Sequence, residues 1–437
     1  MFGVSAVSRV QQALDAAHAS QASLNAFTFI DDDQALQRAE QIDARIQAGE
    51  YAGPLAGVPI GLKDLIDQAG RTTTCGSAFY RHEAEITAPV VARLEEAGAV
   101  IIGRTGLHEW AFGFSSENPH FGPVRNPWDP STSTGGSSGG SGAAVAAGIT
   151  PISIGTDTGG SVRVPAGLCG CFGLKTTHGR VPLEGVFPLV SSLDTVGPLA
   201  DSIDNLEQAY RAMADEQQPL PTDFRAFRIG IPQPWYEMSP TDDEVATGFE
   251  EALDRLKELG HQVHPLQLPD AYPPGLIWDT IAEEVTEVHA RFIAEGKPYG
   301  EDVAERLRDA EKVGPLQTQK AREWQAMIRS RFSDAFETVD LLVIPTVPVM
   351  RKEIGNDMLG GHHYRKVLSW FTALGSQTLC PSIAVPLAGT GSPPVSIQLM
   401  APHNSELTLL GFGRTLESHG MIGFQAASSG LSNLGGQ

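Results

Sequence analysis

The sequence predicts an α/β protein, because helices and buried strands alternate along it. A helix, a glycine turn and a buried strand follow one another in APVVARLEEAGAVIIGRT (88–105), and the same order returns in DDEVATGFEEALDRLKELGHQVHPL (242–266). Apolar strands recur near the end of the chain, in VDLLVIPTVPV (339–349) and PSIAVPLAG (381–389). Alternation at this spacing favours a layered α/β architecture. The 437 residues, 41% of them hydrophobic, are enough to bury a large core.

The remaining elements follow in chain order. Residues 1–50 predict two amphipathic helices, and LAGVPIGLKDLIDQAG (55–70) predicts a short strand and a turn. Residues 120–200 combine Gly, Ser and Thr with short apolar runs and few charges, which indicates backbone packed in the interior. Residues 270–335 are helical and charged, as expected of an insertion that covers one face. The tail SSGLSNLGGQ (428–437) is expected to fray.

Composition argues against several classes of protein. The formal net charge of −21 provides no basic face for nucleic acid, and an anionic membrane surface would repel the chain. No apolar run reaches transmembrane length, and the first residues lack the pattern of a secretory signal, so we expect a soluble, cytoplasmic protein. The cysteines are too few for a disulfide framework, and their one C-x-C motif has no partner motif that would complete a metal site. We expect all of them to be small buried hydrophobes: Cys75, Cys169, Cys171 and Cys380.

The stretch STSTGGSSGGSGAAVAAG (131–148) has three interpretations. A flexible linker is disfavoured, because the stretch lies between apolar segments and continues into a helix. A phosphate loop is disfavoured, because no G-x-x-x-x-G-K-[ST] motif is present. The third interpretation is a nucleophile site, since GGSSG fits G-x-S-x-G with Ser137 as the nucleophile. A Ser-His-Asp hydrolase of this kind would use a downstream histidine such as His403 or His419.

Two further segments carry residues suited to the same chemistry. In ISIGTDTGGSVRVPA (152–166) a buried strand leads to two glycines and Ser161, a turn that can point several backbone N–H groups at a developing oxyanion. A tight structural turn explains the same letters. Lys63 directly follows an apolar strand, where desolvation would lower its pKa and provide a neutral amine as a base. A lone lysine of this kind is also explained as a surface residue.

Together these three segments resemble the amidase signature family of serine hydrolases. GGSSGGS is followed by GTDTGGSVRVPA, with Ser137 and Ser161 24 positions apart, and KDLIDQAGRTTTCGS supplies the lysine segment. The resemblance is clearest over about 53–200, resumes over about 338–402 and is weakest over about 205–335. It implies a single domain over 1–437, built on a large twisted mixed β-sheet between helical layers.

The resemblance also implies roles for individual residues. Ser161 would be the nucleophile, Ser137 the bridging serine and Lys63 the base, with a cis peptide bond between Gly136 and Ser137. No metal and no cofactor is expected. Backbone N–H groups of the nucleophile loop would hold the oxyanion and neighbouring side chains would support that loop, namely Thr158, Gly159 and Gly160 for the first role and Ser138, Asp157 and Arg163 for the second.

The substrate is less sharply implied. One branch of the family consists of the glutamine-hydrolysing chains of glutamyl-tRNA amidotransferase, whose glutamine-binding arginine and aspartate align near Gln325 and Ser369 here. Because these residues lack the charge pair, we expect a stand-alone amidase that prefers a small neutral amide to glutamine. We expect no nucleic acid or membrane partner, and a homodimer remains open. His362 and His363, in GGHHYRKVLSW (360–370), are expected at the surface or in the pocket lining.

Overall fold

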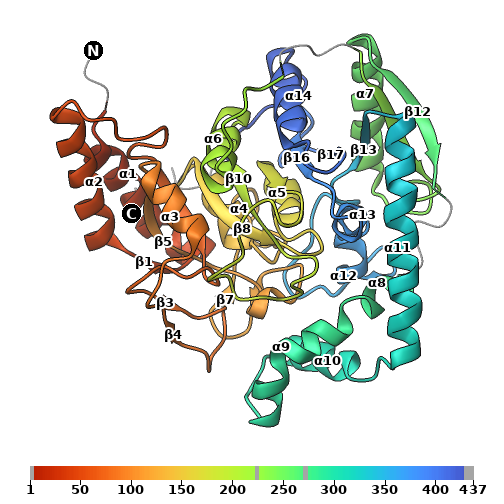
Figure 1. Ribbon diagram of the computed structural model, residues 1–437, viewed down its shortest axis with the longest axis horizontal. Coiled ribbons are helices and arrows are strands. Elements are labelled where there is room, and N and C mark those ends of the chain that lie inside the picture. Colours follow the sequence, from red (N-terminus) through yellow and green to blue (C-terminus); the bar gives the residue numbers. More distant parts are fainter. Residues whose placement is uncertain (1–3, 222–225, 269–273, 428–437) are drawn as a thin grey trace.

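The computed structural model describes residues 4–221, 226–268 and 274–427, and the α/β class is confirmed within them (Figure 1). The tail from 428 onward, which was expected to fray, lies outside the described residues. Strands from both ends of the chain share one mixed sheet, so the described chain is a single α/β domain. In spatial order the eleven strands are β1 (Phe27–Ile30), β5 (Val100–Thr105), β2 (Pro59–Lys63), β8 (Ile152–Asp157), β10 (Thr195–Ala200), β9 (Phe172–Lys175), β16 (Ser382–Pro386), β17 (Ser396–Met400), β13 (Leu341–Pro345), β11 (Arg228–Gln233) and β12 (Gln262–Gln267).

Helices cover both faces of this sheet, and three short hairpins lie outside it. The helices are α1 (Ala6–Leu24), α2 (Asp32–Gln47), α3 (Pro89–Glu96), α4 (Gly139–Ala146), α5 (Arg163–Cys169), α6 (Ile203–Ala214), α7 (Asp243–Glu258), α8 (Pro274–Asp279), α9 (Ala282–Ala294), α10 (Glu301–Ala310), α11 (Pro315–Thr338), α12 (Tyr364–Leu368), α13 (Thr372–Gln377) and α14 (Glu406–Ser418). The hairpins pair β3 (Thr72–Thr73) with β4 (His82–Glu83), β6 (Glu117–Asn118) with β7 (Gly122–Pro123), and β14 (Met358–Leu359) with β15 (His362–His363).

Alternation along the central strands separates the two helical layers. In β5, Val100 and Ile102 pack into a core with α1, α2 and α4, whereas Ile101 packs into a second core with α3, α6 and α14. Successive side chains of a strand point to opposite faces, so one apolar run serves both layers. Figure 1 shows α6, α14 and α7 along the upper edge of the view, with α4 and α5 near its centre. The layered arrangement predicted from the sequence is therefore confirmed.

The ends of the predicted elements follow ordinary local rules. Helix α1 begins after Ser5, whose side chain accepts a hydrogen bond from the Ser8 backbone N–H (3.1 Å). Helix α3 begins at a proline and is followed by Gly98 at φ +91°, where an added Cβ would lie 2.3 Å from the Ala52 carbonyl oxygen. The short strand β1, between α1 and α2, is absent from the sequence prediction and pairs with β5 at the sheet edge.

The sheet register positions the segments that carry the candidate residues. Strand β2 is parallel to β5 and to β8, with Leu62 opposite Ile154, so β2 and β8 end side by side. Lys63 is the last residue of β2, and the loop after β8 carries Ser161. Helix α4 is buried along its whole length and directly follows Ser138. The Ser/Gly stretch is therefore an interior turn that continues into a buried helix, and the linker interpretation is wrong.

Residues 274–338 form four helices, α8 to α11, as the sequence predicted for this region. In Figure 1, α9 and α10 lie at the lower edge of the view, and α11 runs up the side of the molecule beyond α12 and α13. Helix α11 packs against α8 and α13. Helices α8 and α10 contribute residues to the wall of the cavity that Ser161 lines.

Candidate active site

Lys63 lies at the end of β2, fully buried among hydroxyl groups. Its Nζ donates hydrogen bonds to Ser137 Oγ (2.7 Å) and Thr156 Oγ1 (2.8 Å). Burial lowers the pKa of Lys63 from 10.5 to about 7, although Asp157 and Asp194 favour its charged form. The amine is therefore available in both protonation states near neutral pH, and the interpretation of Lys63 as a surface lysine is wrong.

Ser137 precedes α4 in the Ser/Gly turn. The Gly136–Ser137 peptide bond is cis, as the resemblance implied. The Ser137 carbonyl oxygen accepts a hydrogen bond from the His108 backbone N–H (3.1 Å). Gly136 packs so tightly that an added Cβ would lie 2.8 Å from Ser116 Oγ, so this position requires glycine. The turn is thus fixed by contacts on both sides of Ser137.

Ser161 lies on the neighbouring segment, between β8 and α5. Its carbonyl oxygen accepts a hydrogen bond from the Ser138 backbone N–H (3.2 Å), which ties the two serine segments together. Ser138 Oγ in turn bonds to the backbone carbonyl and N–H of Thr156, at 3.2 Å each. The Ser161 hydroxyl donates no hydrogen bond to any described residue, and Ser161 lines a cavity. It is therefore free to meet a ligand there.

The two glycines before Ser161 form a tightly packed turn. Gly160 has φ +139°, and an added Cβ would lie 2.2 Å from Thr372 Oγ1. Thr372 Oγ1 also donates to the Gly159 carbonyl oxygen (2.7 Å). In the described part of the chain, the N–H groups of Gly159, Gly160 and Ser161 have no hydrogen-bond acceptor. Such unpaired donors in a fixed turn can stabilise an anion.

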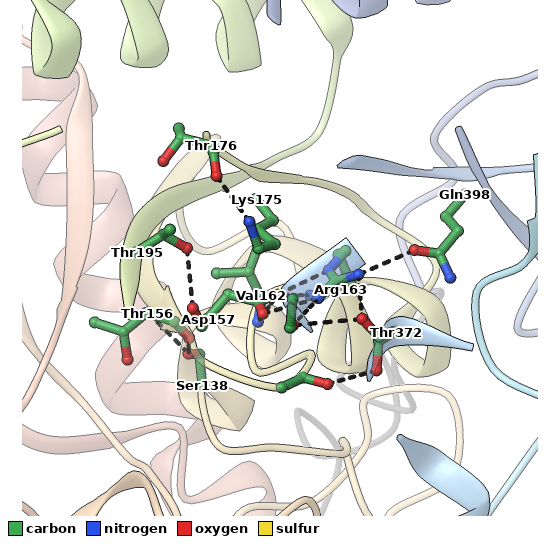
Figure 2. A network of polar contacts seen from close by, with 12 residues as sticks. Ser138, Thr156, Asp157, Val162, Arg163, Lys175, Thr176, Thr195, Thr372 and Gln398 are labelled. Carbon is green, nitrogen blue, oxygen red and sulfur yellow. Dashed lines mark hydrogen bonds and ion pairs between the residues drawn. The ribbon is translucent and has the colours of Figure 1, made fainter. Parts of the chain in front are cut away.

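A buried ion pair supports this turn from behind (Figure 2). Arg163 Nε and Nη2 donate to Asp157 Oδ2 (2.9 Å) and Oδ1 (3.0 Å), and both side chains are fully buried. Arg163 also donates to the Thr372 carbonyl oxygen (2.8 Å) and to Gln398 Oε1 (3.1 Å). Burial raises the pKa of Asp157, but the Arg163 guanidinium outweighs this effect and holds it below its usual value. The buried charges of Arg163 and Asp157 therefore neutralise each other.

Asp194 is a residue that the sequence analysis missed. Its carboxylate accepts hydrogen bonds from the Thr158 hydroxyl and from the backbone N–H groups of Leu189 (2.9 Å) and Val190 (3.0 Å). Burial raises the pKa of Asp194 to about 6. It therefore anchors the start of the nucleophile loop to the 189–194 segment. Asp194 belongs to no motif, so its sequence context gave no signal of this role.

A cavity of about 420 Å³ opens at Ser161. One part of its lining comes from the nucleophile loop, and another from α8 and α10. Ser369 and His363 line the cavity, whereas Gln325 lies behind the lining and donates to Gln377 Oε1 (2.7 Å). The side chains that give it an apolar surface are Phe112, Phe114, Leu189, Leu193, Ile277, Trp278, Ile281 and Trp370. Its size is that of a small-molecule site.

Other residues singled out by the sequence lie elsewhere. His403 bonds to the Thr378 carbonyl oxygen (2.9 Å) and His419 to that of Thr415 (2.8 Å). Among the described residues, no imidazole makes a hydrogen bond to the Ser137 hydroxyl, which Lys63 contacts instead.

All four cysteines are free and buried, as predicted. The described chain contains no cluster of His, Cys, Asp or Glu suited to a metal ion. None of the helices in that part of the chain is long and apolar enough to cross a membrane.

Comparison with known proteins shows two kinds of relative. The chain is 34% identical to the GatA-type chain of glutamyl-tRNA(Gln) amidotransferase from Chromohalobacter salexigens, over 92% of this chain and 90% of that protein. It is also 34% identical to AtzE, a component of 1-carboxybiuret hydrolase from Pseudomonas sp. (strain ADP), over 94% of each chain. Both relatives are named as subunits of an enzyme.

Solved structures show the same likeness. A structure described as a vestigial protein complex that reveals the origins of an s-triazine catabolic enzyme superposes with a TM-score of 0.89 at 33% identity, over 97% of each chain. A crystal structure of an amidase also gives a TM-score of 0.89, at 32% identity over 95% of this chain and 96% of that one. The Amidase family model matches residues 8–410, nearly the whole of the described chain. The protein therefore belongs to the amidase signature family.

Proposed function

We propose that this protein hydrolyses an amide through an acyl-enzyme on Ser161, with Ser137 and Lys63 as the proton relay. The observation that carries the proposal is the 2.7 Å contact between Lys63 Nζ and Ser137 Oγ in a fully buried site. The pKa of Lys63, lowered to about 7, makes a neutral amine accessible near neutral pH. Arginine could not take this role, because its guanidinium stays protonated in proteins.

The relay moves protons in both directions. Neutral Lys63 accepts a proton from the Ser137 hydroxyl while Ser137 accepts one from Ser161, whose oxygen attacks the amide carbon. The unpaired N–H groups of the nucleophile loop, including that of Thr158, receive the oxyanion. Ser137 then gives a proton to the leaving amine, and water releases the acid by the same relay. Asp157, Arg163 and Ser138 hold the loop without touching the reacting atoms.

Covalent labelling tests this proposal. A fluorophosphonate probe followed by peptide mass mapping should place the adduct on Ser161. An adduct on Ser137 or Ser138 would favour the G-x-S-x-G interpretation instead. Absence of both labelling and amide turnover would contradict the enzymatic proposal itself.

A second candidate function is glutamine hydrolysis as one chain of a glutamyl-tRNA amidotransferase. The first relative is such a chain by name, and the second also belongs to a larger enzyme, so the comparisons favour this candidate over a stand-alone amidase. It would require a partner chain. Against it, Gln325 and Ser369 provide no charge pair for an amino acid, and Gln325 lies behind the cavity wall.

Steady-state kinetics separates the two candidates. For a stand-alone amidase, we expect the isolated chain to hydrolyse a small amide without a partner, with glutamine at least about tenfold poorer in kcat/KM. Preferred hydrolysis of glutamine, or activity that appears only when a tRNA-binding partner chain is added, would assign the protein to the amidotransferase branch. Ser161 labelling is expected in both cases, because both candidates use the same nucleophile.

A further inference from the structure

Arg306 places an unpaired cation in the wall of the cavity that Ser161 lines. It lies on α10 and is only 9% exposed. Its Nη1 donates to the Phe112 carbonyl oxygen (2.6 Å), and its guanidinium carbon lies 3.9 Å from the centre of the Phe112 ring. Its Nε and Nη2 donate to no described residue, and its guanidinium forms no ion pair with the described chain. The Nε and Nη2 edge of the guanidinium therefore has no hydrogen-bond partner among the described residues.

The nearby carboxylates are already paired with other groups. Asp302 binds His108 Nε2 (2.9 Å) and Arg365 Nη2 (2.7 Å), and Asp309 binds Lys312 Nζ (2.7 Å). Arg365 and Lys366 also line this cavity, and so does Asp309, whose charge Lys312 balances. Burial, with Arg365 nearby, lowers the pKa of Arg306 to about 10, so it stays charged near neutral pH. A cationic wall in a chain of net charge −21 indicates a ligand of opposite charge.

The open edge has a filled counterpart in the same molecule. Arg163 uses its Nε and Nη2 to hold both oxygens of Asp157, at 2.9 and 3.0 Å. The same two nitrogens are the ones that Arg306 leaves unpaired among the described residues. A guanidinium edge of this kind matches a carboxylate through two parallel hydrogen bonds. The Arg163–Asp157 pair therefore shows which group would fit the unpaired edge of Arg306, namely a carboxylate.

We propose that the substrate is an amide that also carries a carboxylate, bound by Arg306 while the amide lies at Ser161. This inference rests on the proposed function and names its substrate class. Leu189, Leu193, Ile277 and Ile281 line the same cavity and suit a short hydrocarbon chain between the two groups. The expected substrates are monoamides of small dicarboxylic acids, in place of the neutral amides expected from the sequence. Arg306 is separate in the chain from position 325, where the amidotransferase arginine aligns.

Matched substrate pairs test the inference directly. Succinamate and glutaramate are compared with 4-oxopentanamide and 5-oxohexanamide, which replace the carboxylate by a neutral methyl ketone of similar shape. The wild-type protein should favour each acid by about 10- to 100-fold in kcat/KM, as expected for hydrogen bonds to a charged group. Arg306→Met should remove this preference with little change for the ketones, and Arg306→Lys should retain part of it. Arg308→Gln is the control, because Arg308 is an exposed residue on the same helix paired with Glu301.

Protection of Ser161 gives a second measurement that needs no turnover. Glutarate should slow labelling of Ser161 by a neutral fluorophosphonate in the wild type and in Arg308→Gln, and have no effect in Arg306→Met. Equal hydrolysis of acids and ketones, or protection that persists in Arg306→Met, would overturn the carboxylate subsite while leaving a labelled Ser161 and the proposed function intact. A wild-type protein that is never labelled at Ser161 would overturn both.

Discussion

The two walls of the cavity differ in how they treat a buried arginine. In the wall that carries Ser161, Arg163 is fully buried and Asp157 fills its Nε and Nη2 edge. In the wall built by α8 and α10, Arg306 is also buried, but the same edge is open. This difference in hydrogen bonding indicates a different role for each wall. A completed network fixes the loop around Ser161, whereas an incomplete one leaves room for a ligand group.

The same contrast holds for the hydroxyl and amide groups of the first wall. Lys63, Ser137, Thr156 and Ser138 bond to one another or to backbone groups. The exceptions are the Ser161 hydroxyl and the N–H groups next to it, which are unpaired in the described structure beside the cavity. In these two walls of the cavity, the unpaired groups of the Ser161 loop and of Arg306 lie where we propose contact with substrate.

The largest expected effect is loss of the nucleophile. Ser161→Ala should lower kcat/KM for any amide substrate by about 10⁴-fold or more, because no acyl-enzyme can form. Ser131→Ala is the matched control, since Ser131 is an exposed serine near the start of the same Ser/Gly stretch. Comparable activity in Ser161→Ala and the wild type would mean that the unpaired hydroxyl is not the point of attack.

The next effect concerns the completed network. Asp157→Asn leaves the Arg163 guanidinium buried without its counter-ion and should destabilise the fold by about 3–5 kcal/mol, measured by urea unfolding. Asp254→Asn is the control, because Asp254 pairs with Lys257 on the exposed surface (2.8 Å) and its loss should leave unfolding unchanged within error. A small change in the free energy of unfolding of Asp157→Asn would show that this wall does not depend on the Asp157–Arg163 ion pair.

Much of the first wall could be predicted from the sequence. Ser137, Ser161 and Lys63 occur in short motifs with fixed spacing, and backbone constraints there select specific residues, as Gly136 against Ser116 shows. The alternation of helices and strands also identified β2, β5, β8, β12, β13 and β16, whereas β1, β9, β10, β11 and β17 had no strand prediction. Of the missed strands, β1 has only four residues and lies at the edge of the sheet, where little burial pattern distinguishes it.

The second wall could not be predicted in the same way. Arg306 lies in a charged amphipathic helix, and the sequence around it is typical of a solvent-exposed helix face. Only the tertiary packing of α10 over Phe112 makes this arginine buried and leaves its neighbour Arg308 exposed. Asp194 and Thr156 were missed for the same reason, because their roles arise from partners far away in the chain.

The pH dependence of activity tests the role of Lys63. Since its pKa lies at about 7, the neutral base is lost below pH 7 and kcat/KM should fall about tenfold for each further pH unit. Lys175 is the matched control, because it is also buried and its pKa is lowered to about 8, but it bonds to carbonyl oxygens instead of serine. Lys175→Met should keep the profile. A profile that is flat between pH 5 and 8 would contradict the proposed base.

The free energy of unfolding should also depend on pH through Lys63. The buried lysine that serves catalysis is expected to destabilise the fold. The folded pKa of about 7 lies below the ordinary 10.5, so below pH 7 the fold must bury an ammonium, and this penalty fades as pH rises from 7 to 10.5. Lys63→Met should therefore be inactive but more stable than the wild type. Its advantage in urea unfolding should shrink by roughly 2 kcal/mol between pH 7 and 9. An advantage that does not vary with pH would mean that Lys63 is not buried as a charge.

The smallest expected effect belongs to the second wall. Gln325 donates to Gln377 Oε1 (2.7 Å), and Gln377, which lines the cavity, donates to Thr280 Oγ1 (3.1 Å). Gln325→Ala removes one hydrogen bond behind the wall, worth about 0.5–1.5 kcal/mol, so KM should rise by less than about tenfold while kcat is unchanged.

Gln319→Ala is the matched control for this change, because Gln319 lies on the same helix and its amide, among the described residues, bonds only to Glu323 (2.9 Å) at the exposed surface. It should leave both kinetic constants unchanged. A fall in kcat at constant KM in Gln325→Ala would mean that the helical wall acts on the transition state itself. The separation between a wall that performs the chemistry and a wall that selects the substrate would then no longer hold.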